Sequence, residues 1–524
     1  MTMYLTQPVH KGLRERPNDL AAIFNDERLT RAQFAERVAR LAGALQALGL
    51  QPGDRVGMLA LNSIRYLEYF YASWWAGGVV NPVNIRWSPA EVAYSLDDCD
   101  TRILIVDDAF AGMVPALRTQ SSCLKTVIHC GTPGKAPEGA LDFEALLDRA
   151  QPVPDAHRNG DDLAAIMYTG GTTGRPKGVM LSHTNLTANA LSAAGSVPRP
   201  RGSSGLVVSP MFHVAGCGLS IILMQRLGTA VIVPGFDEAA ILAAVQAHKP
   251  YEMFLVPMMI RRLIENPRFA EHDLSSIRMV LYGAAPIEAA LLEAAMKALP
   301  QAGFAQAYGM TELSPTITLL GPDDHLPGPL QATRLRAAGR PVPIAEVRIV
   351  DGDDNELPVG QVGEICARGP MVMLGYWNKP AETAAALKGG WMHTGDGGRF
   401  DADGYLYVVD RIKDMIVTGG ENVYSAEVEN ALASLDGVAQ CAVIGVPDEK
   451  WGERVHAVIV KRGDAVGAAL DEAAVIAHCK TLIAGYKCPR SVEFRTELPM
   501  SAAGKLQKFA LREPYWAGKA RRVN

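Results

Sequence analysis

Apolar runs that are typical of β-strands alternate with alanine- and leucine-rich helical runs through most of this chain. The helical pattern of residues 31–48 precedes the apolar run 55–61, and the same order recurs at 89–99 and 102–108. This alternation is typical of helices layered on largely parallel sheets. At 524 residues the chain is too long for one hydrophobic core, so two to four domains are expected. The pattern therefore predicts an α/β fold.

The composition describes an ordinary globular protein. Hydrophobic residues make up 48% of the chain, charged residues 20%, and the formal net charge is -5, which argues against a general nucleic-acid binder. The N-terminus lacks the apolar segment of a signal peptide, and Pro210 and His213 interrupt the least polar run, 205–224. We expect a cytoplasmic protein without a transmembrane segment, in which this run is a buried core segment.

The eight cysteines are scattered, with no C-x-x-C pair and no other metal-ligand spacing. We interpret them as reduced thiols that are mostly buried. The eleven histidines include no H-E-x-x-H, and no serine stands in a G-x-S-x-G turn. The sequence therefore does not support a serine hydrolase or a zinc hydrolase.

A glycine-rich loop, "YTGGTTGRPKGV" at 168–179, follows the apolar run "LAAIM". It is not a Walker loop, because Arg175 and Pro176 stand directly before Lys177. It is not a G-x-G-x-x-G loop either, because Thr169 stands where the first glycine would be. Its glycine amides, threonine hydroxyls and lysine are nevertheless groups that bind phosphate, and Pro176 disfavours a direct continuation into a helix. The alternative is a flexible linker, but linkers seldom begin on a buried apolar strand.

The pattern changes near Asp410. Short glycine-punctuated strands precede this residue, and a helix, a hairpin-like pair of apolar runs and a second helix follow it. We expect the first of these helices to begin near Ser425, with Ser425 as its cap and Glu427 in its first turn. The last hundred or so residues are therefore predicted to form a compact α+β unit, joined to the rest through "DRIKD" at 410–414.

Five longer stretches occur along the chain: "YTGGTTGRPKG", "LYGAAPI", "AQAYGMTE", "WMHTGDGGRFDADGYLYVVDRIKDMIVTGGENVYSAEVE" and "LPMSAAGKLQK". In order and spacing they resemble the core motifs of the acyl-adenylate-forming (AMP-binding) superfamily of acyl-CoA synthetases, adenylation domains and beetle luciferases. The resemblance covers essentially the whole chain. The joint and the segment "VIGVPDEKWGE" are most similar to the branch of fatty-acyl-CoA and aryl-CoA ligases.

Four residues depart from the commonest pattern of this superfamily. Gly171 replaces a usual serine, and Ala307 a frequent glycine. Ser425 replaces a usual proline, and Met500 a usual basic residue. Only Gly171 lies in the phosphate loop, where one lost hydroxyl would weaken a pyrophosphate contact by about 1 kcal/mol. The remaining threonines and amides should suffice.

The resemblance implies a large N-terminal domain of layered α/β sheets with a β-barrel-like subdomain, and a small mobile α+β C-terminal domain. We place the ATP- and acid-binding domain at residues 1–411. The C-terminal domain, which carries the catalytic lysine, is placed at 412–524, with Lys413 as the hinge about which it turns.

The resemblance also implies a reaction. A carboxylic acid and ATP form acyl-AMP and pyrophosphate, and coenzyme A then releases AMP to give acyl-CoA, with Mg²⁺ required. Thr311 would donate to the α-phosphate, Glu312 would hold Mg²⁺, and Lys505 would bridge the carboxylate and the α-phosphate. The residues expected to cradle the β- and γ-phosphates are Thr169, Gly170, Gly171, Thr172, Thr173, Gly174 and Lys177.

The other ATP and coenzyme A contacts follow from the same resemblance. Asp396 would accept hydrogen bonds from the ribose hydroxyls, with Arg411 beside it, and Tyr308 would offer a flat face to adenine. Outside this context Asp396 would be read as a turn residue, and Thr311 and Glu312 as a helix start. The further ATP-binding residues are Gly283, Ala284, Ala285 and Gly309, and the coenzyme A path is assigned to Gly419, Gly420 and Glu421.

The acyl pocket is assigned to His213, Val214, Ala215, Gly216, Gln306, Ala307 and Met310. Ala215 stands where hydroxycinnamate ligases of the superfamily commonly have an aromatic residue, so an elongated slot for a medium- or long-chain fatty acid is expected. His213 is either a pocket gate or a core histidine. Alternatives are a benzoate- or cinnamate-type CoA ligase, a carrier-protein-loading adenylation enzyme, a luciferase-like oxygenase and a non-catalytic nucleotide-binding scaffold. A homodimer and a peripheral membrane contact stay open, and the loop 197–205 is predicted to be a solvated excursion whose charge could meet an anionic surface.

Overall fold

The computed structural model describes residues 3–169, 176–329, 331–419, 421–500 and 506–517, without the side chains of Lys413 and Asn422. The chain divides into two compact units. The larger unit comprises Met1–Ala285, Leu291–Val347 and Ala367–Met392, and the smaller unit comprises Pro286–Ala290, Arg348–Cys366 and His393–Asn524. The predicted domain boundary between residues 411 and 412 stays a prediction.

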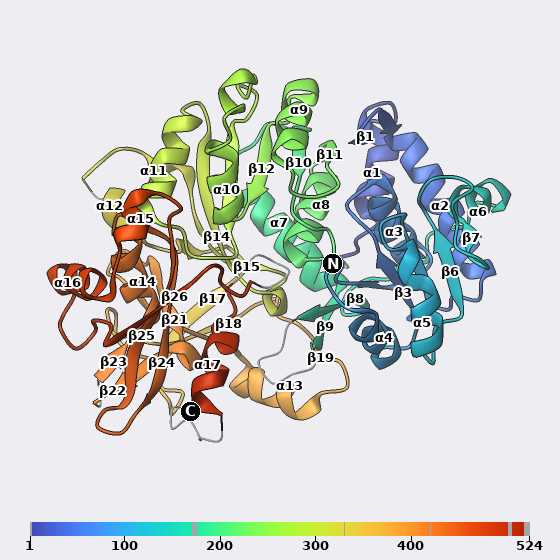
Figure 1. Cartoon of the computed structure of the whole chain (residues 1–524). Coiled ribbons are helices and arrows are strands. Elements are labelled where there is room, and N and C mark those ends of the chain that lie inside the picture. Colours follow the sequence, from blue (N-terminus) through green and yellow to red (C-terminus); the bar gives the residue numbers. More distant parts are fainter. Residues whose placement is uncertain (1–2, 170–175, 330, 420, 501–505, 518–524) are drawn as a thin grey trace. The chain divides into compact units, whose positions relative to one another are not determined.

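A nine-stranded sheet forms one layer of the larger unit. Its order is β16-β15-β14-β13-β12-β10-β11-β1-β2, in which the strands from β14 to β1 run parallel and those at the two edges run antiparallel (Figure 1). The strands are β1 (Leu20–Phe24), β2 (Glu27–Thr30), β10 (Gly205–Val207), β11 (Ala230–Ile232), β12 (Glu252–Leu255), β13 (Met279–Gly283), β14 (Gly303–Gly309), β15 (Thr316–Leu320) and β16 (Arg340–Pro341).

An eight-stranded sheet forms a second layer of the larger unit, in the order β19-β9-β8-β4-β3-β5-β6-β7. Strands β3 to β8 run parallel, and β9 and β19 are antiparallel additions at one edge. The strands are β3 (Arg55–Leu59), β4 (Val79–Pro82), β5 (Thr101–Val106), β6 (Thr126–His129), β7 (Leu141–Asp142), β8 (Leu163–Thr169), β9 (Lys177–Ser182) and β19 (Gly375–Tyr376).

Two helices, α3 (Ile64–Trp75) and α7 (His183–Ser196), contact both of these sheets, and a third, α8 (Val214–Gln225), packs on α7. In α3 every residue except Arg65 is buried, because the helix packs on β1 of one sheet and on β3 and β4 of the other. The least polar run of the sequence folds into β10 and α8, which confirms that it is a core segment. In the described part of the chain, no helix has the length and apolar character needed to cross a membrane.

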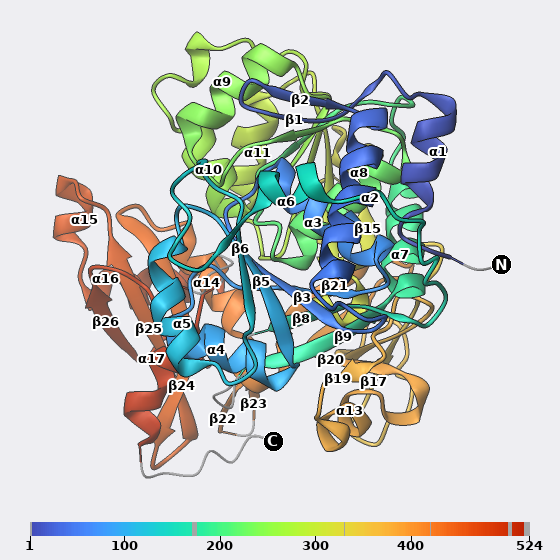
Figure 2. The same ribbon diagram turned by 90° about the vertical axis from the view of Figure 1, so that its right-hand side faces the viewer.

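Further helices cover the outer faces of the two sheets. Helix α2 (Arg31–Ala47) confirms the helix predicted at 31–48, and Thr30 caps it through a reciprocal bond with Gln33. Figure 2 shows α4 and α5 beside β5 and β6, where Val92, Leu96 and Leu104 share one buried cluster. The remaining helices are α1 (Gln7–Glu15), α4 (Pro89–Asp98), α5 (Val114–Gln120), α6 (Phe143–Arg149), α9 (Glu238–His248), α10 (Pro257–Ile264), α11 (Ala289–Ala298), α12 (Gln331–Arg334) and α13 (Pro380–Ala386).

The smaller unit holds two further sheets. One has the order β17-β18-β20-β21, with β17 (Glu346–Val350), β18 (Gly363–Arg368), β20 (Met392–Phe400) and β21 (Leu406–Arg411). The other has the order β23-β22-β25-β24 with β26 beside β25, and it includes the predicted hairpin β24–β25. Its elements are β22 (Ile416–Thr418), β23 (Glu421–Val423), α14 (Ser425–Ala433), β24 (Val438–Asp448), β25 (Gly452–Lys461), α15 (Ala465–Ala469), α16 (Glu472–Leu482), β26 (Ser491–Arg495) and α17 (Lys508–Trp516).

These layers confirm the predicted fold class, a large α/β part with mixed sheets and a small α+β part. The eight cysteines form no disulfide, and five of them are buried, in agreement with the prediction of reduced thiols. The loop 197–205 exposes Pro198, Pro200 and Arg201, as predicted for a solvated excursion, but one of its two arginines is not solvated. Arg199 in this loop is buried and pairs with Glu252, whereas Arg201 is exposed and pairs with Glu15. The arginines of the loop are therefore bound to carboxylates of the same chain.

Candidate active site

The glycine-rich loop connects two antiparallel strands. β8 ends at Thr169 and β9 begins at Lys177, and these two residues are direct partners in the strand register. The middle of the loop, which includes Gly170, Gly171, Thr172, Thr173 and Gly174, lies outside the described residues. The strand β8 is apolar and buried, and the chain continues into a strand and not into a helix, as Pro176 predicts. The two ends of the loop are thus held next to each other by strand pairing.

The predicted magnesium ligand follows the strand β14. Thr311 and Glu312 form the start of a 3₁₀ turn, Thr311–Leu313. Glu312 is buried, with only 6% of its surface exposed. Asn189 of α7 donates hydrogen bonds to the carbonyl oxygens of Leu313, at 3.2 Å, and Thr316, at 2.7 Å. The buried amide therefore fixes the backbone that presents the carboxylate.

Tyr376 contacts both Lys177, at the end of the glycine-rich loop, and Glu312, the predicted magnesium ligand, although sequence reasoning did not select it. Its hydroxyl donates to Glu312 Oε1 at 2.9 Å, and Lys177 Nζ lies 5.1 Å from the centre of its ring. β19, which carries Tyr376, pairs with β9, which begins at Lys177. The only signal in the sequence is the aromatic pair Tyr376–Trp377 some 65 residues after the glutamate, and no local pattern links them.

The residues predicted to surround adenine lie at the ends of two neighbouring strands. Tyr308 and Gly309 end β14, and Gly283 ends β13, where it pairs with Ala307. Ala284 follows with a φ of +64°, a left-handed conformation that costs an alanine about 1 kcal/mol. This turn leads directly to Ala285 beyond the carboxyl end of the parallel strands, the usual ligand-binding edge of such a sheet.

The predicted acyl pocket combines the start of α8 with the end of β14. His213 is the N-cap of α8, followed by Val214, Ala215 and Gly216, while Gln306 and Ala307 lie in β14 and Met310 just after it. Pro315 lies between the two parts. On one side, a Cβ on Gly218 of α8 would lie 3.6 Å from Pro315 Cδ. On the other side, the Pro315 carbonyl accepts from the Met310 amide at 2.9 Å.

Gly216 has a packing reason to be glycine. A Cβ on this residue would lie 2.3 Å from the carbonyl oxygen of Pro210 and 2.6 Å from that of Ser209, distances that no side chain tolerates. The helix therefore approaches the preceding backbone closely at Gly216. Its neighbour Ala215 is half-buried, and this close approach does not account for its small side chain. The predicted slot therefore depends on Ala215.

The predicted ribose-binding residues form a pair within the smaller unit. Asp396 on β20 and Arg411 on β21 are register partners, and Arg411 Nε lies 3.3 Å from Asp396 Oδ1. Glu364 on β18 braces this part of β20, because its carboxylate accepts from the Gly395 amide at 2.9 Å and lies 2.8 Å from His393 Nδ1. The carboxylate of Asp396 is thus held on a supported strand.

The predicted hinge, Lys413, lies in a 3₁₀ turn, Ile412–Asp414, between β21 and β22. The helix α14 begins at Ser425 as predicted, but Ser425 does not cap it. Instead Asp410 accepts from the Ser425 amide at 2.6 Å and from its hydroxyl. The prediction of a serine cap is therefore wrong, because the carboxylate of Asp410, from before Lys413, occupies the helix N-terminus.

A buried lysine supports the same helix end. Lys508 of α17 donates to the Ser425 hydroxyl, and its Nζ lies 2.8 Å from Glu429 Oε1. Burial opposes the charge of this ammonium, but Glu429 and Asp410 outweigh it and raise the pKa of Lys508. The ammonium therefore stays charged between the two carboxylates.

The predicted coenzyme A residues lie at the hairpin of β22 and β23. Gly419 has a φ of +62°, and a Cβ there would lie 2.6 Å from the Trp451 ring, so packing alone requires a glycine. Glu421 begins β23, and Gly420 lies outside the described residues. The predicted catalytic lysine, Lys505, also lies outside them, in the segment 501–505. The residues that flank this segment, Met500 and Leu506, pair in an antiparallel bridge.

Among the described residues, two groups of side chains have metal-ligand chemistry. Glu364, Cys366 and His393 lie on β18 and β20, the strands that support Asp396. His10, Asp155 and His157 lie near the N-terminus, where the buried Asp155 carboxylate accepts from Thr6 at 2.6 Å and lies 2.7 Å from His10 Nε2. The two imidazole rings are nearly parallel, 26° apart, so their lone pairs do not converge on one point. The histidines and Thr6 therefore cluster here because they form hydrogen bonds with the buried Asp155 carboxylate.

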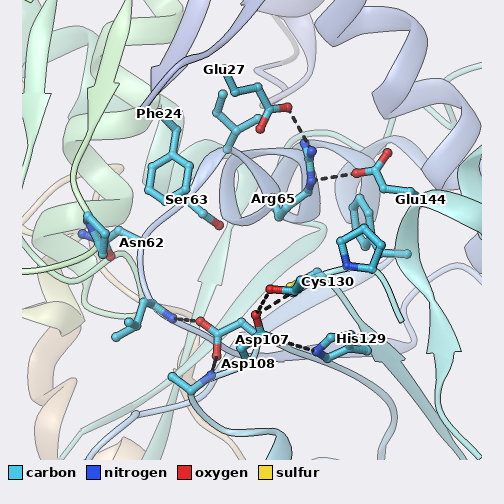
Figure 3. Close-up of a pocket in the computed structure, with 18 of the residues that line it drawn as sticks. Phe24, Glu27, Asn62, Ser63, Arg65, Asp107, Asp108, His129, Cys130 and Glu144 are labelled. Carbon is cyan, nitrogen blue, oxygen red and sulfur yellow. Dashed lines mark hydrogen bonds and ion pairs between the residues drawn. The ribbon is translucent and has the colours of Figure 1, made fainter. Parts of the chain in front are cut away.

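A cavity of about 490 Å³ lies at the carboxyl ends of β3, β5 and β6, and none of the predicted site residues lines it. Figure 3 shows its charged side chains bound to one another: Arg65 contacts Glu27 at 2.9 Å and Glu144 at 2.8 Å, and His129 contacts Asp108 at 2.9 Å. Arg65 and His129 are therefore already paired with carboxylates of the same chain, whereas Asp107 accepts from backbone amides, among them those of Leu61 and Ala109.

Two family models match the chain. The "AMP-binding enzyme" model matches residues 9–377, and the "AMP-binding enzyme C-terminal domain" model matches residues 427–505. The matched segments include the glycine-rich loop, Glu312 and Tyr376 in the first case and Lys505 in the second.

Named relatives are similar to the chain over almost its whole length. A feruloyl-CoA synthase from Amycolatopsis sp is 39% identical over 97% of this chain and 98% of its own. A fatty acid–[acyl-carrier-protein] ligase, ScoC, from Streptomyces coeruleorubidus is 35% identical over 99% and 98%. A medium/long-chain-fatty-acid–CoA ligase, FadD8, from Mycobacterium tuberculosis is 35% identical over 99% and 92%. Among solved structures, ATP-bound MatB from Rhodopseudomonas palustris has a TM-score of 0.89 at 32% identity, covering 99% of this chain and 100% of its own.

Proposed function

The chain belongs to the family of AMP-binding enzymes, as an AMP-forming acid–thiol ligase, and we propose from this premise that it joins a medium- or long-chain aliphatic acid to coenzyme A. The observation that carries the activity is the contact of Lys177 and Glu312 with one tyrosine, Tyr376. A cation at the start of a strand and a carboxylate on a 3₁₀ turn, both in contact with one tyrosine, suit the binding of a triphosphate together with a divalent cation.

In the first half-reaction a carboxylate oxygen of the acid attacks the α-phosphorus of ATP, and pyrophosphate leaves with the electron pair of the broken bond. Lys177 and the glycine-rich loop would bind the β- and γ-phosphates, and Thr311 would donate to the α-phosphate. Asp396 and Arg411 would hold the ribose. Glu312 suits Mg²⁺, which prefers carboxylate and phosphate oxygens and would neutralise the phosphate charge when bound. Lys505 would stabilise the charge that develops at the α-phosphate.

In the second half-reaction the thiol of coenzyme A loses its proton and attacks the acyl carbonyl carbon, and AMP leaves. AMP is a far better leaving group than the oxide that an unactivated carboxylate would have to release, which is why the first step precedes the second. Gly419, Gly420 and Glu421 would line the path of the thiol arm. Lys413 would be the hinge about which the C-terminal domain turns, so that Lys505 leaves the site and the residues of the thiol path enter it.

The aliphatic substrate is supported by Ala215. This small, half-buried residue follows His213 at the start of α8, and no aromatic side chain narrows the site at this position. The similarity to FadD8 favours the same substrate class. An elongated apolar acid would gain about 0.8 kcal/mol for each methylene that it buries in such a slot.

A second candidate substrate is an aryl acid, which the similarity to the feruloyl-CoA synthase favours. The similarity to ScoC in the same way favours a carrier-protein thiol in place of coenzyme A. A homodimer, a peripheral membrane contact and a cytoplasmic location stay predictions.

One assay series tests the proposal. Purified protein is incubated with ATP, Mg²⁺ and coenzyme A and with single acids from C2 to C18, benzoates or cinnamates. We expect pyrophosphate and AMP with the longer aliphatic acids and little turnover with cinnamates. ADP as the nucleotide product would contradict adenylation, and higher kcat/KM for cinnamates than for every aliphatic acid would assign the aryl substrate. Thioester formed on a carrier protein but not on coenzyme A would assign the carrier-loading reaction.

A further inference from the structure

Tyr376 contacts both charged residues that the proposed adenylation step places at the phosphates. Its hydroxyl donates to Glu312 Oε1 at 2.9 Å, and its ring face lies 5.1 Å from Lys177 Nζ. The carboxylate and the ammonium therefore contact different parts of one side chain. An ammonium at this distance from an aromatic ring is attracted to it electrostatically.

The backbone around Tyr376 is fixed from several directions. It pairs with Val179 of β9, two residues after Lys177, and the Trp377 amide donates to the Gly178 carbonyl at 2.8 Å. The Tyr376 amide donates to Thr383 Oγ1 of α13 at 2.9 Å. The backbone from which the Tyr376 ring extends is therefore fixed relative to β9, the strand that begins at Lys177.

Glu312 is fixed at its backbone by the same segment of the chain. Its carbonyl oxygen accepts from the Met373 amide at 2.9 Å, three residues before Tyr376. Residues 373–376 thus hold Glu312 twice, by a backbone bond and by the tyrosine hydroxyl.

We propose that Tyr376 is a positioning residue of the adenylation half-reaction, a role that rests on the proposed function. Its hydroxyl binds one oxygen of Glu312 and so holds the carboxylate in one orientation toward a divalent cation. Its ring attracts the ammonium of Lys177 and keeps it at the end of the glycine-rich loop. Without Tyr376, two opposite charges in a partly buried site would be free to reorient toward each other instead of toward magnesium and phosphate.

A pair of substitutions separates the two contacts. Tyr376→Phe removes the hydroxyl and keeps the ring, whereas Tyr376→Leu removes both. Tyr515→Phe is the matched control, because the Tyr515 hydroxyl donates to a glutamate, Glu493, at 2.7 Å on an element that the proposed chemistry does not use. Each variant is assayed for pyrophosphate release against Mg²⁺ concentration, for MgATP binding by calorimetry, and for conversion of supplied acyl-AMP and coenzyme A to thioester.

In Tyr376→Phe we expect the Mg²⁺ concentration for half-maximal adenylation to rise about tenfold, because one hydrogen bond to an ionised carboxylate is lost. The ATP affinity at saturating Mg²⁺ should change less than about threefold, because the ring still faces Lys177. Tyr376→Leu should weaken MgATP binding further. Thioester formation from supplied acyl-AMP should match the wild type in both variants, and Tyr515→Phe should leave the Mg²⁺ dependence unchanged.

An unchanged Mg²⁺ dependence in Tyr376→Phe would overturn the proposal. Equal losses in adenylation and in thioester formation would also overturn it, since they would mean that Tyr376 only stabilises the fold. A wild-type protein that binds MgATP but forms no acyl-AMP with any acid would refute the proposed function, and Tyr376 would then be judged on the Mg²⁺ dependence of ATP binding alone.

Discussion

Ala215 and Gly216 are neighbours in the sequence, yet their small side chains have different causes. Gly216 is required by backbone packing, because a Cβ would lie 2.3 Å from the Pro210 carbonyl oxygen. Ala215 is half-buried and is proposed to leave room for the acid. Two small residues in a row, which the sequence presents as one feature, thus divide into one that serves packing and one that is proposed to serve specificity.

Ala215→Trp is expected to shorten the acyl chain that the enzyme accepts. Each methylene that the indole displaces from the slot costs about 0.8 kcal/mol, so kcat/KM should fall more steeply for long than for short acids. Gly216→Ala is the matched variant, and it should lower the thermal unfolding temperature with little change in the chain-length profile. An unchanged profile in Ala215→Trp would place the acyl pocket elsewhere.

His183 is a buried titrating residue outside the proposed site. It is 1% exposed, its Nδ1 accepts from the Leu5 amide at 3.3 Å, and burial lowers its pKa to about 4. In the unfolded chain the pKa is about 6.5. As the pH falls through 6.5 the unfolded state gains a proton that the folded state does not bind, so stability is lost between pH 6.5 and about 4.

His183→Gln removes this titration. Between pH 6.5 and 4.5 its free energy of unfolding should fall about 2–3 kcal/mol less than that of the wild type, a difference set by the pKa gap between the two states. Urea unfolding at the two pH values measures the difference. Parallel pH dependence in both proteins would show that His183 is protonated in the folded state.

At the scale of single elements, the start of α14 depends on a residue outside the helix. Asp410 ends strand β21, before the predicted hinge, and accepts from the amide and the hydroxyl of Ser425 after it. A carboxylate at a helix N-terminus is favourable because it meets unpaired amides and the positive end of the helix dipole. The pattern around Ser425 predicts a helix start correctly but assigns the cap to the wrong residue.

Asp410→Ala should destabilise the C-terminal elements more than Ser425→Ala. The aspartate change removes two hydrogen bonds to a charged acceptor and should cost about 1.5–3 kcal/mol, whereas the serine change leaves the amide bond and should cost about 1 kcal/mol. Denaturant unfolding followed by tryptophan fluorescence measures both, with Trp451 and Trp516 as reporters in this unit. An equal or larger loss in Ser425→Ala would show that the carboxylate is not the cap.

At the scale of the whole molecule, the proposed chemistry draws on both compact units. Lys177, Glu312 and Tyr376 belong to the larger unit, and Asp396 and the segment 501–505 belong to the smaller one. If Lys505 acts only in the first half-reaction and Gly420 only in the second, substitutions at the two positions must fail at different steps.

Lys505→Ala should lose acyl-AMP formation by about 10²–10³-fold or more, because a charge aimed at the transition state is gone. It should still convert supplied acyl-AMP and coenzyme A to thioester at close to the wild-type rate. Gly420→Leu should show the reverse, because its side chain would block the thiol path. Single-turnover assays of each half-reaction separate these outcomes. Equal impairment of both steps in both variants would contradict a mechanism in which the C-terminal domain takes a different orientation for each half-reaction.

Much of the fold could be predicted because strands, helices and their order depend on residues close together in the sequence. The helix at 31–48, the core run 205–224 and the hairpin of β24 and β25 follow from local periodicity, and the structure confirms all three. The glycine-rich loop and the Thr311–Glu312 pair could be selected in the same way, since each is a continuous motif.

By itself, then, the sequence determined the α/β class, the α+β C-terminal part and the membership in a family, because local pattern and motif order carry that information. Only the tertiary structure decided which distant residues meet. Tyr376 reaches Glu312 through a two-residue edge strand, the Asp410 carboxylate binds the N-terminus of α14, and Gly216 meets the Pro210 carbonyl through close helix packing. Such contacts depend on how strands and helices pair in space, and pairing between residues far apart in the chain leaves no local pattern to read.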